Sequence, residues 1–291
     1  MEVYISTGAF RFKGLGEIIQ FSINHGIDHI ELSSGLAYQP NLLDQVRATN
    51  QTQITYLIHN YFPPPEQPFV LNLASSDART RKRSLDLCRE AIDLTDEIGA
   101  PFYSVHSGFA FDMKPDLLGK PASQNRIPRS DHIPYDEAYD IFSENVISLT
   151  EYAGSKGIRL LVENNVVSPV ILAEHNRGSL LMASVDEIVQ LITDVGDPNF
   201  GVLVDVGHVN VTANALGFSR EQFIEILAPH IGAFHLSHND GQTDQNLPFD
   251  ENAWFCPLLK HFHNVPFVIE AYHLSWTQMQ REYQVLEAVA K

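Results

Sequence analysis

The sequence has few cysteines, no long apolar run and few basic residues, and each shortage argues against a class of protein. Its two cysteines, Cys88 and Cys256, form no CxxC motif, so no disulfide framework is predicted and a reducing cytoplasm fits. We interpret Cys88, within an amphipathic run, as a buried small hydrophobic residue. No window approaches the roughly 18 continuous apolar residues of a transmembrane helix, and we expect no signal peptide at the N-terminus.

The shortage of basic residues bears on the partner. The chain has 19 lysines and arginines against 36 aspartates and glutamates, a formal net charge of −17. Such a chain repels phosphate backbones at long range, which counts against nucleic acid, although a local basic or metal-lined patch can overrule net charge. Hydrophobic residues make up 44% of the 291 positions, enough for a large buried core.

What the sequence does have is a recurring unit: a short apolar run, a polar break, then a helical pattern. Most of the apolar runs lack alternation, as expected of strands in a parallel sheet that is buried on both faces. The predicted strands cover residues 3–7, 29–33, 54–59, 102–106, 159–163, 201–205, 232–236 and 266–270.

The intervening stretches carry helix signals. Ser184 and Glu187 form a capping-box pattern at the start of a predicted helix that ends at Gly196. Ser219 and Gln222 form a second capping-box pattern, and the longest amphipathic run ends before Gly99. Eight strand-then-helix units predict a single (β/α)8 TIM barrel over residues 1–291. A doubly wound open sheet is the second choice, because the sequence after the first strand matches a glycine-rich phosphate loop poorly.

The longest break between predicted elements is residues 107–134. It follows the fourth strand, on the side where barrel active sites lie, so we interpret it either as a lid over that face or as a surface insertion. Its basic residues Lys120, Arg126 and Arg129 are candidates for contacting a substrate phosphate or carboxylate, or for a solvated loop surface.

Six consecutive predicted strands end in a possible metal ligand, and the segment "RLLVENN" is the clearest case. The carboxyl ends of all barrel strands face one rim, so these side chains should converge on one space. The candidates, in chain order, are His59, His106, Glu163, Asp205, His235 with His238, and Glu270. Carboxylates crowded together repel one another but become stable around a divalent cation, so we predict a metal site.

These motifs, "HNYFPP", "VHSG", "LLVENN", "DVGH", "FHLSHNDG" and "VIEAYH", occur in an order that resembles the xylose isomerase-like barrel superfamily over nearly the whole chain. That superfamily includes endonuclease IV, ketose 3-epimerases of the D-tagatose type, hydroxypyruvate isomerase and sugar phosphate isomerases. The resemblance is specific to the superfamily, and no single motif identifies a substrate.

By resemblance, four residues are expected to bind a divalent cation, with Mn²⁺, Zn²⁺, Co²⁺ and Mg²⁺ all compatible with the donor set. They are Glu163, Asp205, His235 and Glu270. The two glutamates are the expected catalytic acid and base, and His208 the expected substrate contact. His235 is chosen over His238 by motif position alone; the two point to opposite sides of an extended segment.

The remaining histidines leave two interpretations open. His59 and His106 match two zinc ligands of endonuclease IV, but they can equally contact substrate, as can Asn164 and His238. The third zinc site of endonuclease IV needs an aspartate–x–histidine, and this chain has Asp244 and Asn246 instead. Asparagine binds zinc poorly, so the departure weakens the nuclease reading.

We therefore expect a metal-dependent isomerase or epimerase of a sugar, a sugar phosphate or a related hydroxy-carbonyl compound. Its glutamates would move a proton through a metal-stabilised enediolate. The alternatives are an endonuclease IV-like zinc phosphodiesterase and a dehydratase or lyase that uses the same metal site. A homo-oligomer is possible because symmetric oligomers are common among enzymes.

Overall fold

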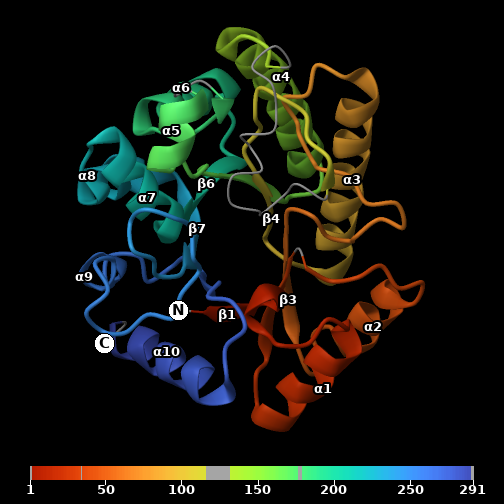
Figure 1. The fold of residues 1–291 in the computed structure, drawn as a ribbon. Helices are drawn as coiled ribbons and strands as arrows, with labels where there is room; N and C mark the ends of the chain where they lie inside the picture. Colours follow the sequence, from red (N-terminus) through yellow and green to blue (C-terminus); the bar gives the residue numbers. More distant parts are fainter. Residues whose placement is uncertain (1, 34, 116–131, 176–178, 290–291) are drawn as a thin grey trace.

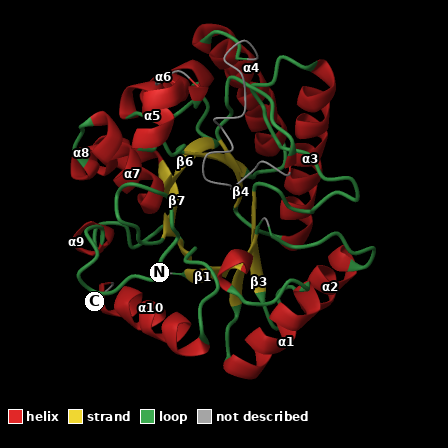
Figure 2. Cartoon of the chain, in the orientation of Figure 1, coloured by secondary structure: helices red, strands yellow, loops and turns green. Residues whose placement is uncertain are grey.

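The computed structural model describes residues 2–33, 35–115, 132–175 and 179–289, and its centre is a closed barrel of eight parallel strands. The strands follow one another around the barrel in sequence order, as the central ring in Figure 2 shows. They are β1 (Val3–Ser6), β2 (His29–Leu32), β3 (Thr55–His59), β4 (Phe102–His106), β5 (Arg159–Glu163), β6 (Phe200–Asp205), β7 (Ile231–Leu236) and β8 (Phe267–Ile269). Each predicted strand is present to within a residue at either end, which confirms the (β/α)8 barrel.

Helices surround this ring on the outside (Figure 1). They are α1 (Leu15–His25), α2 (Leu42–Thr49), α3 (Ala78–Ile98), α4 (Tyr135–Gly154), α5 (Pro169–His175), α6 (Val185–Val195), α7 (Val206–Leu216), α8 (Arg220–Leu227), α9 (Cys256–Leu259) and α10 (Trp276–Val289), with 3₁₀ turns η1 (Thr7–Ala9) and η6 (Ala228–His230). Among the described residues, no helix is both long and apolar enough to cross a membrane.

The helix ends follow the signals in the sequence. The Glu187 carboxylate accepts a hydrogen bond from the Ser184 backbone N–H at 2.9 Å, and Ser219 Oγ accepts one from the Gln222 N–H at 3.2 Å. Gly99 and Gly196 both take the left-handed conformation that ends a helix. Local chemistry therefore sets where these helices start and stop.

The seventh unit departs from the expected strand-then-helix pattern. Its helix, α9, is only four residues long, and Pro257 stands in its first turn. The preceding stretch carries turn chemistry, for example Asp250 Oδ1 accepting the Asn252 N–H at 2.9 Å. The helical layer is thin here, between β7 and α10.

The interior is a continuous apolar cluster that includes both faces of the strands. Cys88 is fully buried there, as predicted, against the hydroxyl of Tyr103. The buried polar exceptions at the carboxyl ends of the strands are therefore costly, and their grouping needs an explanation.

Candidate metal centre

The polar residues at the strand ends converge as predicted. His59, His106, Glu163 and Asp205 are the last residues of β3 to β6, His235 lies near the end of β7, and Glu270 directly follows β8. Strand register explains the grouping, because His106 pairs with Glu163 across β4–β5 and Asp205 pairs with His235 across β6–β7. All six are buried except His106, which is partly exposed.

One group has the ligand set of a divalent cation. Glu163, Asp205, His235 and Glu270 each offer an atom, and these atoms lie within 4.8 Å of one another. His235 Nδ1 lies 3.9 Å from Glu163 Oε1 and 2.9 Å from Glu270 Oε2, close contacts without hydrogen-bond alignment. Both Glu163 oxygens and Asp205 Oδ2 are also buried without a hydrogen bond to the described residues. Three carboxylates and one imidazole fit a divalent cation, and the buried ligand atoms of Glu163, Asp205 and His235 have no hydrogen-bond partner among the described residues.

The backbone presents Asp205 to this space. Asp205 is the N-cap of α7, and its Oδ1 accepts the His208 N–H at 2.9 Å. Since that bond holds one oxygen, the other is turned toward the group. The "DVGH" motif therefore combines a helix cap and a candidate ligand.

A second group shares Glu163 with the first. His59 Nε2 and His106 Nε2 each lie 3.3 Å from Glu163 Oε2, and the three residues offer atoms within 4.8 Å of one another. His59 Nδ1 contacts Ser104 Oγ at 2.9 Å, which orients the ring. The arrangement suits a second cation and equally suits contacts with a polar substrate.

His208 forms the third part of the cluster. Its Nδ1 donates to the Asn164 carbonyl at 2.8 Å, and its Nε2 lies 3.3 Å from Asp244 Oδ2. Asn246, where the resemblance calls for a histidine, donates its Nδ2 to the same oxygen of Asp244 at 3.3 Å. Asn246 thus acts as a hydrogen-bond donor to Asp244. It does not supply a histidine that could bind a metal ion together with Asp244 and His208.

Burial and crowding divide the histidines into two kinds. Burial, with help from His208 and His235, lowers the pKa of His106 to about 3, and burial also places the pKa of His59 well below its usual range. Burial opposes charge on His208 and His235 too, but nearby carboxylates outweigh it and raise the pKa of both rings well above the usual range. The four rings thus fall into two pairs: the pKa is lowered for His59 and His106 and raised for His208 and His235.

Burial raises the pKa of two carboxyl groups in the cluster. Burial is the main reason that the pKa of Asp205 rises to about 7 and that of Glu163 lies well above its usual range. Neighbouring carboxylates, Glu270 among them, add to both shifts, and His208 and His235 oppose them. Perturbation of this kind in a polar cluster is typical of functional sites.

Asn164 links two strands. Its Oδ1 accepts the Asp205 N–H at 2.9 Å and its Nδ2 donates to the Asp205 carbonyl at 3.3 Å. The neighbouring Asn165 donates to the Gly108 and Leu181 carbonyls. These bonds hold Asp205 in place, and the expected contact of Asn164 with substrate stays a prediction.

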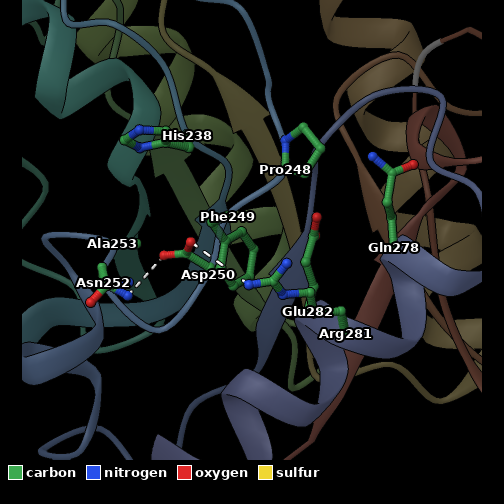
Figure 3. Close-up of a pocket in the computed structure, with 9 residues that line it drawn as sticks. All are labelled: His238, Pro248, Phe249, Asp250, Asn252, Ala253, Gln278, Arg281 and Glu282. Atoms are coloured by element: carbon green, nitrogen blue, oxygen red, sulfur yellow. Dashed lines mark hydrogen bonds and ion pairs between the residues drawn. The ribbon is translucent and has the colours of Figure 1, made fainter.

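His238 does not join the cluster. Its side chain is exposed and lines a separate pocket of about 320 Å³ between the segment after β7 and helix α10 (Figure 3). Of the two candidates after β7, the structure brings only His235 to the other ligands. The basic residues Lys120, Arg126 and Arg129 lie outside the described residues.

Sequence reasoning missed Glu31 in the middle of β2. This side chain is fully buried, and its Oε2 accepts a hydrogen bond from His235 Nε2 at 2.8 Å. A glutamate inside the apolar run "HIEL" was the available signal, because a buried strand rarely carries an acid without a partner.

Comparison with known proteins agrees with this architecture. The sequence model of a family described as the xylose isomerase-like TIM barrel matches residues 19–289. A solved structure described as a D-tagatose 3-epimerase-like protein superposes with a TM-score of 0.74 at 21% identity, covering 99% of this chain and 97% of that one.

Two curated relatives carry different activities in their names. A probable endonuclease 4 from Thermoplasma acidophilum is 28% identical over 189 residues, 63% of this chain and 54% of that protein. A fructoselysine 3-epimerase from Shigella flexneri is 22% identical over 225 residues, 75% of this chain and 69% of that protein. The match thus spans about half the length of the first relative and about two thirds of the second.

Proposed function

We propose, from the premise that this chain belongs to the xylose isomerase-like TIM-barrel family, that it is a divalent-metal-dependent isomerase or epimerase of a sugar or sugar-like hydroxy-carbonyl compound. The observation that carries the proposal is the group Glu163, Asp205, His235 and Glu270, whose ligand atoms lie within 4.8 Å of one another. A divalent cation held by these residues would polarise a substrate carbonyl and acidify the neighbouring C–H bond.

The two glutamates supply the proton transfer in this proposal. Glu163 comes from β5 and Glu270 follows β8, with β6 and β7 between them in the barrel order. Carboxyl groups on two sides of a bound carbon skeleton can remove a proton from one face and return it to the other, which is epimerisation. Return to the neighbouring carbon is isomerisation. In either case the carboxyl group that removes the proton, or its partner, would return it to the substrate.

The histidines around the glutamates provide polar contacts for a substrate. His106 is the most accessible of them, with a side chain 37% exposed, and it is neutral because its pKa is about 3. A neutral imidazole can both donate to and accept from a sugar hydroxyl. We therefore assign His106, with His59 and His208, to substrate hydroxyls in the one-cation form of the enzyme.

The test is exchange of substrate hydrogen with deuterated water across a panel of ketoses and aldoses, followed by NMR with Mn²⁺ present. The variant Glu163→Gln keeps the shape but cannot carry the proton, so its exchange rate should fall by about 100- to 10,000-fold. Glu287→Gln, an exposed glutamate on α10, is the matched control and should keep the wild-type rate. Wild-type protein that exchanges nothing in the panel, or a Glu163→Gln variant at full rate, would contradict the proposal.

A zinc phosphodiesterase acting at abasic sites in DNA is the second candidate. It is favoured by the group of His59, His106 and Glu163, which shares Glu163 with the first group as two adjacent cation sites would. The donor role of Asn246 and the net charge of −17 count against it. Two or three zinc ions per chain together with cleavage of an abasic oligonucleotide would select this function, whereas one cation per chain and ketose exchange would select the epimerase.

A further inference from the structure

Glu31 occupies an unusual position for an acid. It lies in β2 between apolar residues, with no exposed surface, and pairs in register with Ser6 of β1 and Leu57 of β3. Its side chain reaches across the barrel interior to β7, where Oε2 meets His235 Nε2 at 2.8 Å. Because burying an unpaired carboxylate is unfavourable, this contact has to offset the burial.

No lysine or arginine in the described part of the chain forms an ion pair with Glu31, so histidine is the partner that matters. Its second oxygen, Oε1, is buried without a hydrogen bond to any described residue. Glu31 also offers an atom within 4.8 Å of ligand atoms on His59 and His235. The acid therefore lies beside histidines of both candidate groups.

The two nitrogens of His235 face different neighbours. Nε2 faces Glu31, while Nδ1 faces Glu270 at 2.9 Å and Glu163 at 3.9 Å. An imidazole that donates Nε2–H to a carboxylate keeps a lone pair on Nδ1 when it is neutral, and a ligand nitrogen needs that lone pair. Without an acceptor at Nε2, neither the tautomer nor the ring angle would be held.

We propose that Glu31 is a positioning residue that holds His235 with Nδ1 directed at the cation site and thereby sets the affinity of that site. The inference rests on the proposed function, because it assumes that His235 binds the cation. It also explains why β2, which supplies no expected ligand, carries an acid at this height in the barrel.

The experiment measures cation binding rather than turnover. Protein freed of metal is titrated calorimetrically with Mn²⁺ and with Zn²⁺, and Glu31→Gln should bind each about 10- to 100-fold more weakly than wild type. Glu282→Gln is the matched control, since Glu282 is an equally buried acid outside the cluster, and it should bind as wild type does. Glu31→Asp keeps the charge but not the reach, and it should lose affinity as well.

A spectroscopic measurement separates positioning from general stability. In zinc-loaded wild type, long-range proton–nitrogen NMR should show His235 protonated at Nε2 with a shifted Nδ1, and this signature should be lost in Glu31→Gln. Should either Glu31 variant bind with wild-type affinity and retain the signature, the inference is overturned. If wild type itself binds neither cation, the proposed metal site fails, and this inference fails with it.

Discussion

Gly108, next to His106 and Ser107, shows how single residues hold the loops around the site. Its carbonyl accepts hydrogen bonds from the Leu181 N–H and the Asn165 side chain, both at 3.1 Å. A Cβ at this position would come within 2.6 Å of the Ala74 Cβ and 3.0 Å of the Ala74 backbone nitrogen. Only glycine lets the loops after β3, β4 and β5 approach this closely.

We predict that Gly108→Ala destabilises the protein by about 1–3 kcal/mol, because the new methyl group forces backbone apart. Urea unfolding followed by circular dichroism measures the loss. The double variant Gly108→Ala with Ala74→Gly should recover part of it, since the second change removes the methyl group that collides. Equal stability of Gly108→Ala and wild type would show that the loops move apart at no cost.

Helix α10 has an acidic residue on its buried, otherwise apolar face. Its core-facing stripe is Met279, Glu282, Val285 and Leu286, so an acid stands at an apolar position. Glu282 is 1% exposed, neither carboxyl oxygen makes an aligned hydrogen bond to the described residues, and it faces the pocket in Figure 3. Burial raises the pKa of Glu282 to about 8, and the Phe249 amide opposes this rise.

The pKa shift predicts a pH-dependent penalty in α10. The pKa is about 8 in the folded protein and 4.5 ordinarily, so the folded protein keeps this proton to a higher pH than the unfolded chain does. Stability contributed by the neutral acid is therefore lost as pH rises from about 4.5 through 8. Relative to wild type, Glu282→Gln should gain about 3–5 kcal/mol of unfolding free energy between pH 5 and pH 9.

Denaturant unfolding of both proteins at several pH values measures that difference. Exposed Glu287 on the same helix is the control, and Glu287→Gln should track wild type throughout. A constant difference between Glu282→Gln and wild type across the pH range would mean that Glu282 ionises freely in the fold.

At the scale of the whole molecule, cation binding should be linked to folding. The cluster brings three carboxylates from β5, β6 and the end of β8 together, and the unfolded chain separates them. Mn²⁺ at 100 times its dissociation constant should therefore stabilise the fold by about 2.7 kcal/mol and raise Tm by about 4 °C. A chelator should reverse the shift, as read by calorimetry.

The acidic chain makes a control necessary, because a net charge of −17 attracts cations to the surface as well. Asp205→Asn changes one buried ligand and leaves the surface unchanged, so its Tm should respond little to Mn²⁺. If its Tm rises as much as that of wild type, the stabilising cations bind somewhere other than the cluster.

The sequence by itself determined the barrel and most of the residues that form the cluster. Eight apolar runs separated by helical patterns leave few topologies other than the parallel barrel, and in that topology all strand ends face one rim. Glu163, Asp205 and Glu270 could therefore be grouped without coordinates, because a strand's end is a property of local sequence. Helix boundaries at Gly99 and Gly196 were predictable for the same reason.

Only the tertiary structure decided which way the side chains point and which groups they meet. The separation of His235 from His238, the link from Asn164 to Asp205 and the contact of Glu31 with His235 depend on register and packing between distant strands. Glu31 and His235 are 204 positions apart, and no local pattern connects them. The direction of each side chain and its contact partner are set when the barrel closes, because closure brings residues on non-adjacent strands into the same small volume.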